Sequence, residues 1–445
     1  MKLKALTIAV AALAVAHTAS AQTIVNITGA TAFRTATLNT IKARFNASGA
    51  AWKLAHDQNA GNNQAFNGAT LSIFEGTFPG VTGTTIIRTS FNGSVEGIKA
   101  LVDSPASDPN YLQTNVLTSI TAAIGGNSEN GAGNGKGGVS TPVEAVQSDI
   151  AFSDVAKAAT PFKNSSLQPT TASEAGVVTF TMVGSESFPT TVTNLNTQNF
   201  RALLSAGFQP LSFLSGDPAD SSKTVYVTGR NDGSGTRTTY MAETLAGITT
   251  TVNQFLVGGT SGDTITKIYK VPAGGVSAGL TGLVTGLGAS NASTVWGQDI
   301  DGNGGYSSGS TLRGDLARTS TSVTVYDADG SELDSGANIA LVSWLSTSDA
   351  NTARTGGAKI LGYNGVRLDD YATTGTLSAI DLRKITNGAY TAWSYQQMYR
   401  RNDLISGDKV AVYNGIKTNL VLGSSGVAST AMNAFRGTDG GVVAP

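Results

Sequence analysis

The chain has 445 residues, of which 40% are hydrophobic and 13% charged, so it can bury a sizeable core, and its length favours two or three domains. It has no cysteine, which excludes disulfides, thiolate metal ligands, a cysteine nucleophile and a lipid anchor on cysteine. The formal net charge of −1 at pH 7 argues against nucleic acid as a partner, because such binding needs a basic footprint. An anion would therefore have to be held by a local arrangement of donors.

The first 21 residues have the pattern of a secretory signal peptide. Lys2 and Lys4 precede an apolar run at residues 5–16, and small residues follow just before Gln22. We expect the mature protein to begin near Gln22 and to lie in the periplasm or outside the cell, without a lipid anchor. No later apolar run is long enough to cross a bilayer, so we expect no membrane insertion.

Units of strand, turn and helix follow in the first half of the mature chain. The predicted strands are residues 23–28, 70–74, 84–89 and 149–153, and the predicted helices are 35–45, 95–102 and 111–124. Asp154 follows the last of these strands. A carboxylate at the carboxyl end of a strand in an open α/β sheet lies where ligands bind.

The second half continues this pattern, which predicts α/β lobes. Residues 176–183 form the longest β-type run and are predicted to cross between two lobes. Further strands are expected at 338–344 and 358–363, and helices at 197–206 and 382–401.

Glycine- and asparagine-rich segments interrupt these units at residues 56–80, 125–140 and 291–314. Lys136 follows a glycine as in a nucleotide-binding loop, but the required earlier glycine and the following hydroxyl residue are missing. Asp299 and Asp301 match the start of a calcium loop. Its twelfth position is Ser310, where a bidentate glutamate is needed, so ordinary loop residues are the favoured interpretation.

The segment at residues 224–247 combines a strand, a glycine-rich loop and a helix closed by Gly247. Backbone N–H groups at a helix N-terminus can surround a small oxyanion, and a guanidinium can add a fixed charge. The residues that would do so are Arg230, Ser234, Gly235 and Thr236. A surface turn capped by Ser234 explains this loop by itself equally well.

The loop at 229–236 resembles the Arg-Ser-Asp-Gly-Ser-Gly-Thr loop of the phosphate-binding proteins of bacterial ABC phosphate importers. This resemblance implies that Arg230 supplies a guanidinium, that Ser234, Gly235 and Thr236 donate hydrogen bonds, and that Asp232 holds the arginine in place.

Three further turns resemble that family in the same order. The turn at 93–99 is similar to Gly-Ser-Ser-Gly-Gly-Val-Lys and places a ligand hydroxyl at Ser94. Residues 152–154 are similar to Ala-Ser-Asp and place the ligand carboxylate at Asp154. The first turn fits less well: either Thr31 or Phe33 takes the binding role, and Arg34 stands where the family has proline.

By resemblance, the fold is α/β: a two-lobed periplasmic binding protein of type II, in which each lobe is a mixed sheet flanked by helices and the lobes close like a flytrap. The expected division is a signal peptide at 1–21, the first lobe at 22–180, the second lobe at 181–355, and at 356–445 a return to the first lobe followed by a C-terminal segment. The implied ligand is inorganic phosphate and the implied partner is an ABC transporter permease. We expect a monomer without cofactor or metal.

Other classes of protein explain the sequence less well. Outside the signal the chain has a single histidine, His56, which we predict to be an ordinary surface residue, so a Ser-His-Asp triad or a zinc site is not expected. A carboxylate-only phosphatase and a phosphate-scavenging protein not coupled to transport stay open as alternatives. A glycine-rich surface-layer protein would not explain four strand-end turns with anion chemistry.

Overall fold

The structure is a computed structural model. It describes residues 22–57, 68–103, 105, 108–118, 120–124, 142–167, 174–250, 252–271, 304–306, 308–404, 407–422 and 426–445. The predicted signal at 1–21, the loop with Lys136, and Asp299 and Asp301 lie outside these residues. Among the described residues, no helix is both long and apolar enough to cross a membrane.

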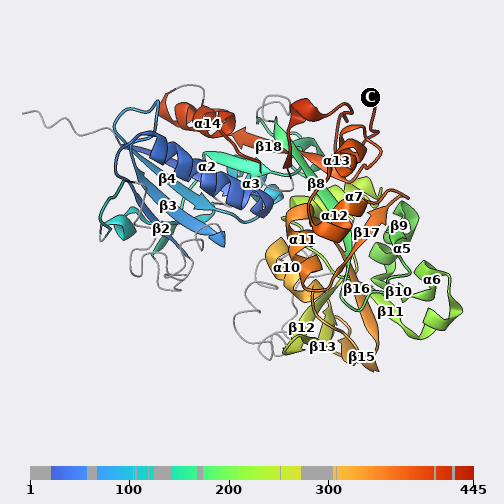
Figure 1. The fold of residues 1–445 in the computed structure, drawn as a ribbon. Helices are drawn as coiled ribbons and strands as arrows, with labels where there is room; N and C mark the ends of the chain where they lie inside the picture. The colour runs from blue at the N-terminus through green and yellow to red at the C-terminus, as the bar shows by residue number, and fades with distance from the viewer. Residues whose placement is uncertain are drawn as a thin grey trace, which may run out of the picture.

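The protein is a mixed α/β structure in two lobes (Figure 1). The first lobe is built around a sheet with the strand order β18-β7-β1-β4-β3-β2. The strands are β1 (Gln22–Gly29), β2 (Lys53–His56), β3 (Leu71–Gly76), β4 (Thr84–Ser90), β7 (Ile150–Ser153) and β18 (Trp393–Arg400). β1 pairs in parallel with both β4 and β7, so the carboxyl ends of these three strands lie at one edge.

Helices cover both faces of the first sheet. α2 (Arg34–Ala47) and α14 (Asp408–Thr418) pack together with Val25 and Ile27 of β1 in one apolar cluster, while α3 (Ser94–Val102) packs with Ala151 and Tyr399 in another. Smaller elements complete this lobe: η1 (Thr31–Phe33), β5 (Asn110–Leu112), η3 (Thr114–Leu117), β6 (Val143–Ala145) and η5 (Lys157–Ala159).

β8 (Glu174–Gly184) runs from one lobe into the other, as its long β-type run predicts. Its first half pairs with β18, and its second half pairs with β16 and β17. One extended strand of eleven residues therefore belongs to both lobes, and the junction of the lobes lies along it.

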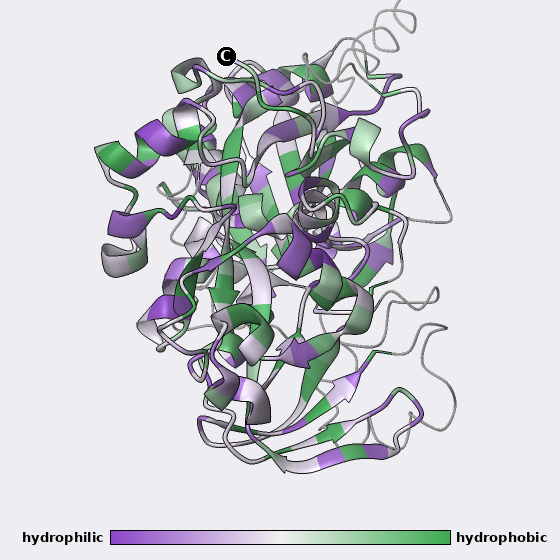
Figure 2. Ribbon diagram, turned by 90° about the vertical axis from the view of Figure 1, so that its right-hand side faces the viewer, coloured by the Kyte–Doolittle hydropathy of each residue, from purple (hydrophilic) through white to green (hydrophobic). Residues whose placement is uncertain are grey.

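The second lobe continues the sheet in the order β8-β16-β11-β10 and has an apolar cluster of its own. Figure 2 shows hydrophobic residues along the central strands. Its strands are β9 (Asn194–Leu195), β10 (Phe208–Pro210), β11 (Thr224–Val227), β16 (Ile339–Ser346) and β17 (Lys359–Tyr363). A separate sheet contains β12 (Phe255–Ser261), β13 (Thr264–Lys270), β14 (Val323–Tyr326) and β15 (Glu332–Ala337).

The helices of the second lobe lie mostly after strands. They are α5 (Thr197–Ala206), α6 (Ser212–Ser215), η6 (Pro218–Ser222), α7 (Gly235–Glu243), α10 (Gly309–Leu316), α11 (Thr347–Thr355), α12 (Asp369–Thr374) and α13 (Ala379–Thr386). β19 (Gly426–Val427) and η7 (Ser429–Ala431) follow near the C-terminus. β17 pairs with the second half of β8 and so lies with this lobe, and the chain re-enters the first sheet only with β18. We therefore propose a lobe border near Trp393 in place of residue 356.

Two predicted helices are wrong. The helix expected at 111–124 is replaced by β5 and the short η3, because Tyr111 and Leu112 pair as a strand with β6. The helix expected at 382–401 ends at Thr386, and β18 follows it. β18 lies between β7 and β8 with most of its residues buried, so its backbone groups are satisfied by two neighbouring strands rather than within a helix.

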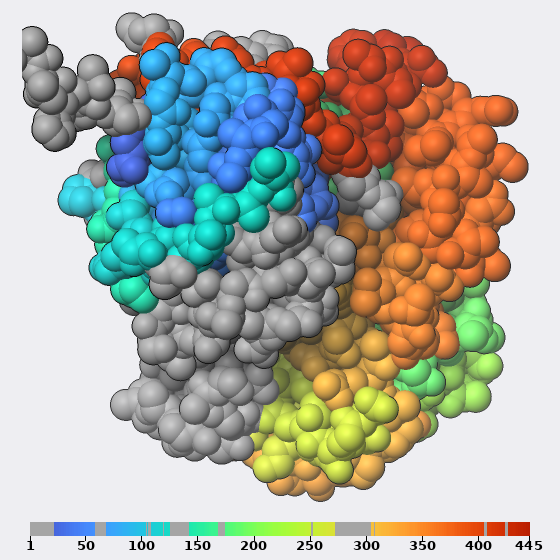
Figure 3. Space-filling model, turned by 60° about the vertical axis from the view of Figure 1, so that its left-hand side comes forward, coloured from blue at the N-terminus to red at the C-terminus, as the bar shows by residue number. Residues whose placement is uncertain are grey.

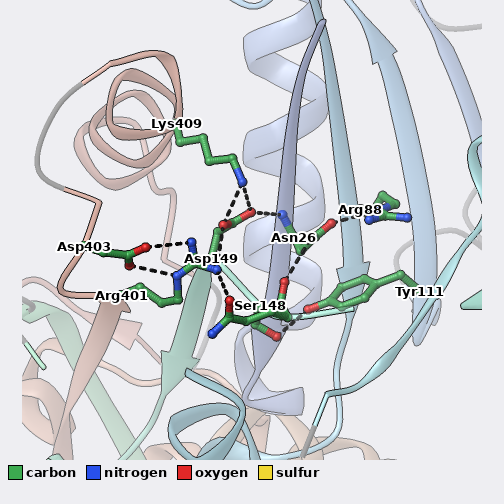
Figure 4. A network of polar contacts seen from close by, with 9 residues as sticks. Asn26, Arg88, Tyr111, Ser148, Asp149, Arg401, Asp403 and Lys409 are labelled. Atoms are coloured by element: carbon green, nitrogen blue, oxygen red, sulfur yellow. Dashed lines mark hydrogen bonds and ion pairs between the residues drawn. The ribbon is translucent and has the colours of Figure 1, made fainter. Parts of the chain in front are cut away.

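A buried ionic network attaches α14 to the first sheet (Figure 4). The Asp149 carboxylate is fully buried and accepts two hydrogen bonds from Lys409 Nζ at 2.8 and 2.9 Å. Arg401 Nη1 lies 3.4 Å from the same carboxylate, and the backbone N–H of Asn26 in β1 donates to it at 2.9 Å. This carboxylate therefore joins three segments that are far apart in the sequence.

Candidate functional site

Three turns of the first lobe converge at the edge where its parallel strands end. Thr31 follows β1, Ser94 follows β4 and Asp154 follows β7, and these strands are neighbours in the sheet. Thr31 begins η1 and Ser94 begins α3, so the start of a helix lies in each of these two turns. The edge therefore offers backbone donors and one carboxylate.

The second lobe contributes the loop between β11 and α7. α7 begins at Gly235, and the side chain of Ser234 caps it by accepting a hydrogen bond from the backbone N–H of Arg237 at 3.4 Å. The cap by Ser234 is present as predicted, but Ser234 is buried rather than on the surface, and anion binding by this loop stays a prediction. The N-terminal end of α7 faces the turns of the first lobe.

The two lobes touch at this point. The backbone N–H of Val95 in α3 donates to the carbonyl of Gly233 at 3.0 Å. A methyl group added at Gly235 would overlap the carboxylate of Asp154 and the hydroxyl of Ser94. Glycine is therefore the residue that lets the start of α7 reach the first lobe this closely.

Asp154 lies where the donors meet, with only 2% of its surface exposed. The Ser94 hydroxyl donates to its carboxylate, and its own backbone N–H donates to the Ser94 oxygen at 3.2 Å. Burial raises the pKa of Asp154 above its ordinary value, because desolvation disfavours the charged form. The Ser94 hydroxyl opposes this rise most strongly, followed by the guanidinium of Arg230, and the Thr236 hydroxyl also opposes it.

Arg230 is a buried cation of the second lobe, with 4% of its surface exposed. Its Nε donates to the carbonyl of Tyr306 at 2.9 Å, which fixes the direction of the guanidinium. Burial lowers the pKa of Arg230, and the negative charges of Asp154 and Asp349 oppose that effect. Arg230 and Asp154 thus come from different lobes and act on each other electrostatically.

Two further charged residues act on Arg230: Asp349, which the sequence analysis did not name, and Arg34, which it named only as a departure from the family's first turn. Asp349 lies in the first turn of α11, after the carboxyl end of β16, and accepts a hydrogen bond from Arg313 at 2.8 Å. Burial lowers the pKa of Arg34, and Asp349 is the first of the charges that oppose this. The Nε of Arg34 is buried without a hydrogen-bond partner among the described residues. Asp349 lies beyond the end of the strand predicted at 338–344, so its position after that strand did not identify it.

The remaining predicted residues are placed as follows. Phe33 is buried, and its ring centroid lies 5.3 Å from that of Phe152. Its backbone N–H donates to the carbonyl of Ala30 at 3.1 Å. Phe33 therefore packs in the core, whereas Thr31 is partly exposed. Asp232 lines a hollow between the lobes beside Arg237, so its support of Arg230 stays a prediction.

The prediction that His56 lies on the surface is wrong. This residue is 1% exposed, because it lies in β2 opposite Ser72 of β3. Within the described part of the chain, no group of three or more histidine, cysteine, aspartate or glutamate side chains could hold a metal ion. The converging residues thus include hydroxyl and backbone hydrogen-bond donors, the carboxylate of Asp154 and the guanidinium of Arg230, with Asp349 and Arg34 near that guanidinium.

No protein-family model matches this chain, and no curated protein sequence does. Solved structures that resemble it include a protein assigned as a phosphate ABC transporter substrate-binding protein, with bound phosphate, from Clostridium perfringens (12% identity, 91% of this chain and 99% of that chain covered, TM-score 0.37). Others are an ABC-type phosphate transport receptor from Vibrio cholerae (10%, 89% and 94%, 0.38) and PstS from Borrelia burgdorferi (12%, 89% and 92%, 0.32).

Proposed function

We propose that this protein is a solute-binding protein that captures inorganic phosphate between its two lobes. The observation that supports this most is the buried carboxylate of Asp154 among donors from both lobes: the Ser94 hydroxyl and the Arg230 guanidinium. A site meant for any anion would contain donors alone, because a carboxylate repels a fully deprotonated ligand. A carboxylate in this position suits an anion that has a proton to donate.

Hydrogen phosphate fits this chemistry. Its P–OH would donate to Asp154, while its other oxygens would accept from Arg230, from Ser94 and from the N–H groups and hydroxyl at the start of α7. Because the donors come from two lobes joined along β8, binding and closure would occur together. The proposal includes delivery of phosphate to an ABC transporter permease, and a non-enzymatic role.

The test is calorimetric titration of protein that has been unfolded, stripped of ligand and refolded. Phosphate and arsenate, which carry a proton at neutral pH, are expected to bind, and sulfate and molybdate to bind at least about 10⁴-fold more weakly. Comparable affinity for sulfate, or no binding of phosphate, would overturn the proposal. Turnover of a chromogenic phosphate ester would contradict the non-enzymatic part.

A further inference from the structure

The C-terminal residues 432–445 form a compact loop on the junction of the lobes. The backbone N–H groups of Asn433 and Ala434 donate to the carbonyl that ends α13, that of Thr386, at 2.8 and 3.0 Å. Phe435 and Ala444 pair as an isolated bridge and so close the loop. Figure 3 shows these residues in red on the surface, beside both the blue first lobe and the orange second lobe.

Arg436 attaches this loop to the junction of the lobes and to α7, which is called the anion-site helix because its N-terminal end faces Asp154. Its side chain is fully buried and lies 2.8 Å from the carboxylate of Glu243, the last residue of α7. Its Nη2 donates to the carbonyl of Thr391 at 2.6 Å, and its guanidinium lies 4.3 Å from the ring centroid of Trp393, where β18 begins. A buried ion pair with further hydrogen bonds fixes the loop at this position.

Asp439 reaches from this loop to the first lobe. Its carboxylate is 6% exposed and accepts a hydrogen bond from the backbone N–H of Ala156 at 2.7 Å. Ala156 is two residues after Asp154 in the same turn. The next residue of the loop, Gly440, adopts a φ of +70° and packs so closely on Ala242 of α7 that a side chain there would overlap its backbone. One short stretch thus contacts the turn of Asp154 and the anion-site helix together.

We propose that residues 432–445 are a strap that holds the turn of Asp154 against α7, and that Asp439 is a positioning residue for the anion site. The strap contacts α7 and α13 in the second lobe and the Asp154 turn in the first. It therefore stabilises the arrangement in which the donors and the carboxylate face each other. The effect on phosphate affinity rests on the proposed function, whereas the effect on the fold does not.

Asp439 gives the strap a dependence on pH. Burial raises its pKa to about 7, and the Ala156 N–H and then the charge of Arg436 oppose that rise. The carboxylates of Asp154 and Glu243 raise it further, and the hydroxyl of Tyr395 on β18 also faces it. Above pH 7 a second negative charge lies behind Asp154, which disfavours a bound anion.

The sign for stability follows from the same pKa. An unfolded aspartate titrates near about 3.9, so between about pH 4 and pH 7 the folded protein holds a proton on Asp439 that the unfolded chain releases. This group's contribution to the free energy of unfolding is therefore full below pH 4 and is lost as the pH rises to about 7. Asp439→Asn removes this pH-dependent contribution to the free energy of unfolding. Its amide oxygen can still accept a hydrogen bond from the Ala156 N–H.

The experiment compares wild type, Asp439→Asn, Asp439→Ala and the exposed control Asp334→Asn on β15. Phosphate affinity is measured from pH 6 to pH 8, and thermal unfolding without ligand from pH 5 to pH 8. Phosphate itself titrates in this range, so the ratio of variant to wild-type affinity is the readout. We expect Asp439→Asn to match wild type at pH 6 and to bind about tenfold more tightly at pH 8.

Asp439→Ala is expected to bind about tenfold more weakly than wild type at pH 6, because the buried Ala156 N–H loses its acceptor, whereas at pH 8 the removal of the negative charge offsets this loss. The unfolding midpoint of Asp439→Asn should fall less between pH 5 and pH 7 than that of wild type or Asp334→Asn. If Asp439→Asn follows wild type in both profiles, the strap proposal is wrong. If no protein binds phosphate, the proposed function fails, and the unfolding profiles still decide on the strap.

Discussion

Replacing Asp154 with asparagine tests the selectivity of the site. Asp154 is 2% exposed, so a sulfate beside it would face a carboxylate from which water is largely excluded. Two unit charges about 4 Å apart repel by about 4 kcal/mol at an effective dielectric constant of 20, and the hydrogen bond from P–OH to a carboxylate contributes about 2 kcal/mol. Together these effects correspond to a preference for phosphate over sulfate between about 10⁴ and 10⁵.

Asp154→Asn keeps the size of the side chain and removes its charge. The amide oxygen would still accept from P–OH, and the amide nitrogen would donate to a sulfate oxygen. We expect the preference for phosphate to fall to about tenfold or less, mainly through a gain in sulfate affinity. Calorimetric titration with both anions measures this, with Asp334→Asn on the exposed β15 as the matched control. A variant that still rejected sulfate by more than about 10³ would refute the role given to Asp154.

Two further substitutions test separate parts of the structure. Arg230→Ala removes the buried guanidinium and should abolish detectable phosphate binding while the circular dichroism spectrum is retained, since the loss of a buried charge contact costs about 2 to 5 kcal/mol or more; unchanged affinity would exclude Arg230 from the site. Asp149→Ala leaves Lys409 and Arg401 without their shared carboxylate and the Asn26 N–H without its acceptor, and should lower the free energy of unfolding by about 1 to 3 kcal/mol. Denaturant unfolding measures this, and a loss below about 1 kcal/mol would show that the network of Figure 4 is not stabilising.

Local patterns predicted most of the elements that position the site. The alternation at 23–28 and 84–89 and the apolar run at 176–183 correspond to β1, β4 and β8. The pattern failed at residues 393–400, where β18 lies between two strands. Aromatic and polar residues are mixed there and do not separate into an apolar and a polar face. A central strand is buried on both sides, and β18 forms because it pairs with β7 and β8.

The residues of the candidate site also fall into those that the sequence identified and those that it did not. Arg230 could be named from its glycine-rich loop and Asp154 from its place after a predicted strand, whereas Ser94 was named through the resemblance to a known family. Asp349 and Asp439 could not be named, since neither belongs to a turn with a recognisable anion motif. Each comes close to the site only through the pairing of distant strands or through the packing of residues 432–445 on the junction.

The sequence by itself determined the α/β composition, the order of the strand-end turns and the kind of chemistry each turn offers, because these depend on contacts between residues close in the chain. Only the tertiary structure decided which strands β8 pairs with in each lobe, that Gly235 abuts Asp154 across the lobes, and that Asp439 lies behind the same turn. Such contacts join residues up to several hundred positions apart, and they depend on burial and strand pairing that no local pattern records.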